Sequence, residues 1–278
     1  MTTARPASRY AALTGRHLAL IALSLLILAP FAWMITTSLK SLDQVNKAPY
    51  LIPAQFEFGN YDNALTAAPF ARYYLNSAVM TVGIVVGHLV LNTLAAYALS
   101  RLQFRGRNAI FLGLVATMLV PAFLTVLPAF DLVIRLGWYN SYAALIVPRL
   151  ADVFGIVVLR GFMLSLPREL DEAGRIDGAN RMQVLVRIIL PLCKPALASV
   201  AVFSFLFSWN DFLWPLLVTN DDQYRTLQIG LSVFTNKYGP WPNYLMAGTV
   251  VAAIPAVVIF LYLQRGLVRG LASTGVKA

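Results

Sequence analysis

The sequence predicts an all-α membrane protein with six transmembrane helices, and two observations support this prediction. The 278 residues are 59% hydrophobic and only 12% charged, and their mean hydropathy of +0.68 is too high for a soluble domain. Six apolar stretches also occur along the chain, each close to the roughly 20 residues that span the hydrocarbon core of a bilayer. They lie at about 17–35, 72–99, 108–130, 142–163, 196–218 and 243–264.

The first apolar stretch follows an N-terminal segment with three arginines, an order that is also found in secretory signal peptides. The stretch is longer than the apolar part of a signal peptide and no small-residue cleavage site follows it, so we expect a first transmembrane helix. Polar and aromatic residues with three prolines follow at 38–70, and we expect them at the membrane surface or against a partner. A first region, 1–71, would thus comprise the cytoplasmic N-terminus, one transmembrane helix and an extracytoplasmic segment.

The positions of lysine and arginine predict the orientation in the membrane. Of the 22 such residues, 15 lie in the N-terminal segment, the loop at 101–107, the segment at 160–194 and the C-terminal tail, and seven lie on the opposite side. Because cytoplasmic loops carry the excess of these residues, we expect both termini in the cytoplasm. The net charge of +10 agrees with this orientation, and without a basic run on a folded polar surface it predicts no nucleic-acid partner.

Residues 165–195 form a charged segment between apolar stretches, and their signals predict two short helices joined by a turn. Ser165 can cap the first helix, Gly178 has the backbone freedom to end it, and Asn180 can cap the second. Small residues at spacings of three and four would let another surface approach the first helix closely. These residues are Ala173, Gly174, Asp177 and Gly178. We therefore expect a docking helix; the alternative is an ordinary loop that its charges keep out of the bilayer.

A spaced motif lies in the same segment. Glu172, Ala173 and Gly174 are followed after three residues by Gly178, and after nine more by 188–191, which reads I-I-L-P. The segment resembles the cytoplasmic loop of ABC importer membrane subunits, whose motif is E-A-A, three residues, G, nine residues and I-x-L-P; the second alanine is replaced here by glycine. The flanking residues and the tail at 265–278 are similar to the carbohydrate-uptake branch of the maltose-permease type. The flanking matches are Pro167, Glu169, Leu170, Ile176, Asp177 and Ala179.

The resemblance implies a type I ABC importer permease fold with a cytoplasmic coupling helix, located in the bacterial inner membrane. It implies a core of five transmembrane helices at 72–265, with the coupling loop at 165–195, and a cytoplasmic tail at 266–278. The implied function is import of a mono-, di- or oligosaccharide or a derivative. The implied partners are a second homologous permease subunit, two cytoplasmic ATPase subunits, an extracytoplasmic solute-binding protein and membrane lipid. The residues implied in ATPase coupling are Glu169, Glu172, Ala173, Gly174, Asp177 and Gly178.

The sequence predicts no catalytic residues and no cofactor or metal site in this chain. It lacks the phosphate-binding motif G-x-x-x-x-G-K-[ST], so we expect ATP and Mg to be used by the partner ATPase. His17 and His88 lie far apart on different apolar stretches, and we expect His88 to be packed or hydrogen-bonded rather than a metal ligand. The single Cys193 is interpreted as a structural thiol.

Polar residues within the apolar stretches are candidates for a solute path, because placing them in lipid is costly. Arg149 and Asp152 are three residues apart, so we expect them to pair along one face of the fourth helix. Asp131 and Arg135 can pair at the outer end of the third helix, and the fifth helix carries polar and aromatic groups of the kind that bind sugars. The alternative role for all of these groups is helix packing. The candidates are Asn76, Asn92, Arg149, Asp152, Trp209, Asn210 and Asp211.

The loop at 219–242 is predicted on the outer side and contains both charge signs and aromatic residues. In the resembled family, the corresponding loop approaches the solute-binding protein. The candidates for this contact are Tyr224, Arg225, Tyr238 and Trp241. The alternative is a solvated turn between two helices.

Three other functions are compatible with a membrane protein of this size. The first is an ABC permease for a different cargo, such as a polyamine, a peptide or a phosphonate. The second is an ion-coupled secondary transporter, in which an intramembrane acid such as Asp131 or Asp152 would couple ion to solute. The third is a membrane scaffold that transports nothing.

Overall fold

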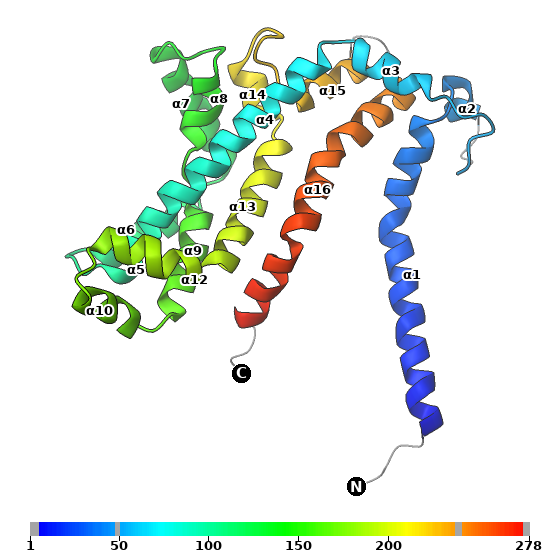
Figure 1. Cartoon of the computed structure of the whole chain (residues 1–278). Helices are drawn as coiled ribbons and strands as arrows, with labels where there is room; N and C mark the ends of the chain where they lie inside the picture. Colours follow the sequence, from blue (N-terminus) through cyan, green and yellow to red (C-terminus); the bar gives the residue numbers. More distant parts are fainter. Residues whose placement is uncertain (1–5, 48–50, 237–240, 275–278) are drawn as a thin grey trace. The chain divides into compact units, whose positions relative to one another are not determined.

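The structure, a computed structural model, describes residues 6–47, 51–236 and 241–274, and every regular element in these ranges is a helix (Figure 1). The chain divides into two compact units. One comprises the residues up to 68 together with 231–251, and the other comprises 69–230 together with the residues from 252 onward. The all-α prediction is therefore confirmed for the described part of the chain.

The first unit contains a long apolar helix and the short helices that follow it. They are α1 (Pro6–Ser38), α2 (Leu42–Lys47), α3 (Gly59–Thr66), the end of α15 (Leu227–Asn236) and the start of α16 (Pro242–Thr274). Buried Asn60 of α3 donates hydrogen bonds to the carbonyl oxygens of Ser38 and Lys40, at 2.9 and 2.8 Å. Because the last carbonyls of a helix have no partner within it, Asn60 stabilises the end of α1.

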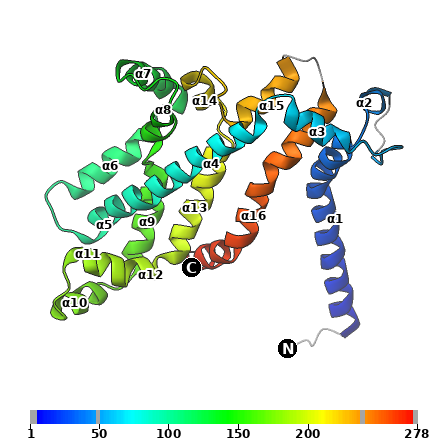
Figure 2. The same cartoon turned by 45° about the horizontal axis from the view of Figure 1, so that its top comes forward.

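The second unit contains the remaining helices, several of which are continuous with one another. They are α4 (Phe70–Gly87), the π-helix η1 (His88–Asn92), α5 (Thr93–Arg101), α6 (Arg107–Thr117), α7 (Ala122–Arg135), α8 (Tyr142–Ile146), the 3₁₀ helix η2 (Val147–Arg149), α9 (Val153–Ser165), α10 (Glu169–Ile176), α11 (Arg181–Val184), the π-helix η3 (Leu185–Ile189), α12 (Leu190–Leu192), α13 (Lys194–Trp209) and α14 (Leu213–Val218). Figure 2 shows α10 and α11 at the end of this unit where α5 ends.

Three helical segments are long and apolar enough to cross a membrane without interruption: Gly15–Ser38, Phe70–Arg101 and Pro242–Tyr262. Three further spans are possible as bent pairs, in which α6 and α7 meet at 98°, α8–η2 and α9 at 41°, and α11–α12 and α13 at 80°. The described residues thus provide between three and six spans, and the predicted six requires that each bent pair crosses once.

The apolar stretches at 108–130, 142–163 and 196–218, each expected to form one transmembrane helix, are interrupted in the structure. Pro121 precedes α7, where it disfavours helical backbone at the residue before it. The fifth stretch ends its helix at Trp209, and α14 begins only at Leu213. Apolar composition therefore does not by itself predict where a helix is interrupted.

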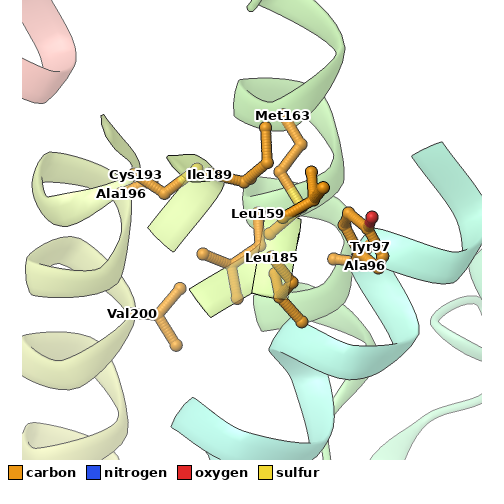
Figure 3. Close-up of a cluster of buried hydrophobic side chains, with 10 residues drawn as sticks. Ala96, Tyr97, Leu159, Met163, Leu185, Ile189, Cys193, Ala196 and Val200 are labelled. Carbon is orange, nitrogen blue, oxygen red and sulfur yellow. The ribbon is translucent and has the colours of Figure 1, made fainter. Parts of the chain in front are cut away.

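A buried apolar cluster joins α5, α9, η3 and α13 (Figure 3). Leu159 and Met163 of α9 are fully buried between Ala96 of α5 and Ile189 of η3. Cys193 is buried in the same cluster, which agrees with its interpretation as a structural thiol. The cluster fixes the helices that lead to α10.

Candidate functional site

Residues 150–152 leave the helix between η2 and α9, and this break lies against the π-helix η1. Asp152 forms the hydrogen bonds that hold the break in place. The Asp152 carboxylate caps α9 by accepting a hydrogen bond from the Gly155 amide at 2.8 Å. Its other oxygen accepts from Asn92 Nδ2 at 2.6 Å, and Asn92 Oδ1 accepts from the Asp152 amide at 3.2 Å. Asn92 is fully buried, and both polar ends of its side-chain amide are hydrogen-bonded to Asp152, one to its carboxylate and one to its backbone amide.

Two glycines allow this close approach. A Cβ at Gly87 would lie 2.8 Å from the carbonyl oxygen of Leu150, and one at Gly155 would overlap the Asn92 amide. The end of the Leu150 side chain also lies 2.6 Å from the Cβ position at Gly87 and could move, but the Leu150 backbone could not, and the Asn92 amide is held by two hydrogen bonds. The sequence motifs did not point to these glycines.

His88 connects the break to α13. Its Nε2 lies 2.8 Å from the carbonyl oxygen of Arg149, and because a carbonyl only accepts, Nε2 carries the hydrogen. Its Nδ1 faces Ser204 Oγ at 2.7 Å and Asp152 Oδ1 at 3.2 Å. His88 is 5% exposed and, as expected from the sequence, is a hydrogen-bonded residue within the packed helices.

Arg149 does not pair with Asp152, so that prediction is wrong. The chain leaves the helix between η2 and α9, and Asp152 has extended backbone (φ −139°, ψ 148°), so a spacing of three does not place the two side chains on one helix face. Arg149 Nη2 instead contacts Asp211 Oδ2 at 3.1 Å. The guanidinium also lies 5.4 Å from the ring centre of Phe207 and 5.5 Å from that of Trp214.

These contacts join α4–η1, the break, α13 and the segment before α14 into one group, here called the polar cluster. Its members are His88, Asn92, Arg149, Asp152, Ser204 and Asp211. A cavity of about 820 Å³ lies beside the polar cluster, with α7 on another side. Four members of the polar cluster contribute to its wall: His88, Arg149, Asp152 and Ser204. Aromatic rings of Phe154, Phe203, Phe207 and Trp214 line it as well.

The remaining solute-path candidates bind other parts of the protein. Asn76 donates to the carbonyl oxygens of Gln223 and Arg225 at 3.0 and 2.8 Å, and so holds the segment before α15. Buried Trp209 donates its indole N–H to the carbonyl oxygen of Ala252 at 2.9 Å. Asn210, which directly follows α13, donates to the carbonyl oxygen of Leu206 in that helix at 2.8 Å. A role for these three in solute contact stays a prediction.

The candidates for binding-protein contact fall into separate parts of the chain. Arg225 pairs with Asp222 at 3.2 Å, and Tyr224 packs edge-on against Tyr142 with ring centres 5.1 Å apart. Trp241 belongs to the other unit, where it stacks on Tyr244 with ring centres 5.4 Å apart. Tyr238 lies outside the described residues.

Asp131 and Arg135 form the expected ion pair, at 2.7 Å, on the exposed side of α7.

The predicted docking helix is α10, and its start differs from the expectation. Ser165 was expected to cap it, but Ser165 is the last residue of α9 and donates to the carbonyl oxygen of Phe162 at 2.7 Å. The helix begins at Glu169, after Arg168. The predicted end is confirmed, since Gly178 has φ +80°, a backbone conformation that favours glycine. Asn180 caps α11 in a reciprocal pair with Gln183, as predicted for this residue.

The close approach expected on the small-residue face occurs within the chain. Gly174 is the buried residue of α10, and a Cβ there would lie 2.7 Å from Ile188 Cδ1 and 3.2 Å from Val184 Cγ2. The bulk of Ile188 therefore occupies the space of an alanine methyl. A second attachment, which the sequence did not predict, is the ion pair of Asp171 with Arg101 of α5 at 2.8 Å.

The face of α10 that does not pack against Ile188 is exposed and charged, and it is called the outer face of α10 whatever its side of the membrane. The side chains of Glu169, Glu172 and Asp177 make no hydrogen bond or ion pair with the described part of the chain. Ile176 is 86% exposed on the same short helix, beside exposed Ala173. A helix that is fixed on one face and bears free carboxylates and an exposed apolar side chain on another is suited to bind a second protein.

Comparison with known proteins places the chain among membrane transport proteins. Residues 81–273 match the family described as binding-protein-dependent transport system inner membrane component. The chain is 36% identical to the arabinooligosaccharides transport system permease protein AraQ of Halalkalibacterium halodurans, over 81% of each chain. It is 32% identical to the sn-glycerol-3-phosphate transport system permease protein UgpE of Rhizobium meliloti, over 99% of each. Its fold is similar to a chain in the crystal structure of a bacterial ABC transporter that imports the acidic polysaccharide alginate, with a TM-score of 0.80, 25% identity and coverage of 95% and 99% of the two chains.

Proposed function

Because the chain belongs to the family of binding-protein-dependent transport system inner membrane components, we propose that it is the permease subunit of an ATP-driven importer that passes a carbohydrate into the cytoplasm. It is a transport permease rather than an enzyme. The observation that carries the mechanism is the exposed acidic face of α10, which is fixed to the chain through Gly174 and Asp171.

The proposed ATPase contact is made by α10 and the turn that follows it. Glu169, Glu172, Ala173 and Asp177 are exposed and would meet a cytoplasmic ATPase subunit, whose ATP and Mg supply the energy. Gly174 and Gly178 allow α10 to pack closely and to turn sharply. One ATPase subunit would bind this chain and another would bind a second, homologous permease. When the two ATPase subunits bind ATP and close on each other, they would push both permeases.

The push has a physical route into the membrane-spanning helices. Gly174 rests on Ile188 of η3, which continues through α12 toward α13, and Asp171 is paired with Arg101 at the end of α5. The apolar cluster of α5, α9, η3 and α13 is closely packed, so these helices would move with α10 as one body. The cavity has α13 in its wall, and its shape would change with that motion.

The cavity beside the polar cluster is proposed as this chain's part of the solute path. Hydroxyl-rich sugars need hydrogen-bonding groups, and the C–H faces of their rings pack on aromatic side chains. The cavity wall offers Arg149, Asp152 and Ser204 together with the rings of Phe203 and Phe207. On the outer side, the proposed contacts with the solute-binding protein are made by Tyr224, Arg225, Tyr238 and Trp241. In this proposed orientation both termini and α10 lie in the cytoplasm.

A charge reversal tests the proposed coupling. Glu172→Lys should reduce copurification of the ATPase subunits and abolish solute-stimulated ATP hydrolysis, because the exposed carboxylate is replaced by the opposite charge. The control is Asp62→Lys, which reverses an exposed acid on α3, far along the chain from α10. Both variants should retain the melting temperature of the complex with the second permease. Unchanged assembly and stimulation in Glu172→Lys would contradict the proposal.

A further inference from the structure

The arginine beside the cavity is neutralised by a carboxylate. Arg149 is the one lysine or arginine among the described residues that line the cavity, and its guanidinium is paired with Asp211 at 3.1 Å. The side chain of Asp211 is only 11% exposed, so the pair is largely shielded from water. Separating the two would leave a buried carboxylate without its cation, which is strongly unfavourable.

A second carboxylate makes the balance more negative. Asp152 lines the cavity with a side chain that is 32% exposed, and its oxygens already accept hydrogen bonds from Asn92 and Gly155. Arg149 contributes one positive charge, Asp152 and Asp211 contribute two negative charges, and His88 contributes none or one positive. The polar cluster is therefore neutral or negative and is not positive in either state of His88.

Aromatic rings form much of the remaining wall. Phe154, Phe203 and Phe207 are 44%, 51% and 62% exposed, and the first two meet edge-on with ring centres 5.6 Å apart. The face of an aromatic ring carries partial negative charge, which attracts C–H groups of a sugar ring and disfavours an anion. The cavity volume of about 820 Å³ lies within the range of sites that hold small-molecule ligands, roughly 300–1,000 Å³.

Resting on the proposed carbohydrate import, we infer that this cavity takes an uncharged sugar and selects against sugars that bear phosphate or carboxylate groups. An anionic sugar would meet no unpaired cation, and a cationic one would compete for carboxylate oxygens that are already bonded. Family membership does not fix this property, since the similar proteins include permeases named for arabinooligosaccharides and for sn-glycerol-3-phosphate. The charge pairing in this chain carries the inference.

Trisaccharides of similar size and different charge test the inference. The purified complex of this chain with its second permease and ATPase subunits, in nanodiscs without ATP, is equilibrated with labelled probes in a dialysis experiment. The neutral probes are maltotriose, arabinotriose and triacetylchitotriose; trigalacturonate is the anionic probe and deacetylated chitotriose the cationic one. We expect at least one neutral trisaccharide to bind about tenfold or more tightly than either charged trisaccharide.

Two matched variants locate the effect. Asp211→Asn frees Arg149 from its counter-ion and should strengthen trigalacturonate binding about tenfold relative to the neutral probes. Asp131→Asn makes the same change of charge at an exposed ion pair of α7 and should leave the preference as in the unaltered chain. A gain in trigalacturonate binding that is equal in both variants would contradict the role of Arg149. The preference of the unaltered complex stands as a test even if Asp211→Asn does not assemble.

The outcomes separate the two proposals. If trigalacturonate or deacetylated chitotriose binds as tightly as the best neutral probe, the charge inference is overturned while carbohydrate import stands. If no trisaccharide of any charge binds, the proposed carbohydrate function is itself contradicted.

Discussion

The polar cluster and α10 both concentrate charged side chains, but they use them in opposite ways. In the polar cluster each acid has a partner within the chain: Asp152 caps α9 and bonds Asn92, and Asp211 pairs with Arg149. On the outer face of α10, Glu169 and Glu172 are exposed and make no such bond with the described residues. Charges that are paired inside the chain support its own fold, whereas unpaired charges on a rigid helix are free to bind another protein.

This difference predicts that substitutions in the polar cluster reduce stability, whereas those on the outer face of α10 reduce assembly. Asp171 is the exception on α10, because it faces inward to Arg101. Four substitutions test this prediction, and they are given from the largest expected loss of unfolding free energy to the smallest.

Arg149→Met should destabilise the chain most, by about 3–5 kcal/mol, because it leaves Asp211 without its cation in a shielded position. The free energy of unfolding can be measured by SDS titration in mixed micelles. Adding Asp211→Leu removes the stranded carboxylate and should recover most of the loss. A loss below about 1 kcal/mol in the single variant would show that the pair behaves like a surface ion pair. It would contradict the view that the paired charges of the polar cluster stabilise the fold.

Asp152→Ala should cost less, about 2–4 kcal/mol, because it removes the cap of α9 and leaves the buried Asn92 amide without an acceptor. Asp152→Asn keeps an oxygen for the cap and should lose about 1 kcal/mol of unfolding free energy in the same titration. Equal losses in the two variants would show that charge, rather than capping, is the main contribution of this residue.

Gly178→Ala should cost about 1–2 kcal/mol, because φ is +80° there and an L side chain is strained in that conformation. Gly174→Ala is the comparison within the same helix, since its Cβ would meet the end of the flexible Ile188 side chain rather than backbone. We expect the second variant to change the unfolding free energy by less than about 1 kcal/mol. The reverse order would show that Ile188 cannot move.

Ile176→Ser should leave the unfolding free energy of the chain within about 0.5 kcal/mol, because the side chain is 86% exposed. Under the proposed function it should nevertheless reduce copurification of the ATPase subunits, since an exposed apolar side chain on a docking helix is expected to be buried by the partner. Pull-down from membranes followed by quantification of both subunits measures this. Full copurification would remove Ile176 from the proposed contact surface.

Local features of the sequence predicted local features of the structure. The cap at Asn180, the turn at Gly178 and the Asp131–Arg135 pair all involve residues within four positions of each other, and the structure contains them. The helix start at Ser165 was predicted wrongly, because a serine that can cap a helix can also be the last residue of the helix before it.

Contacts between distant residues could not be predicted in this way. Arg149 meets Asp211, 62 residues later in the chain, and nothing in the spacing of either residue specifies the other. The expected pairing with Asp152 failed because it assumed an unbroken helix, and an apolar stretch gives no signal that its helix breaks at a capping aspartate. Gly174 was noted as a departure from the usual motif, but only the packing of Ile188 gives a physical reason for it.

The π-helical segments η1 and η3 have a consequence for how this chain tolerates changes in length. A π turn holds one residue more than an α turn, so a single-residue deletion within His88–Asn92 or Leu185–Ile189 can be absorbed by a return to α-helical winding. The faces of the helices on either side would keep their directions, whereas the same deletion in α13 would rotate everything beyond it by about 100°. Gain or loss of one residue at these two places is thus a low-cost route by which the wall of the cavity and the support of α10 can be altered independently during evolution.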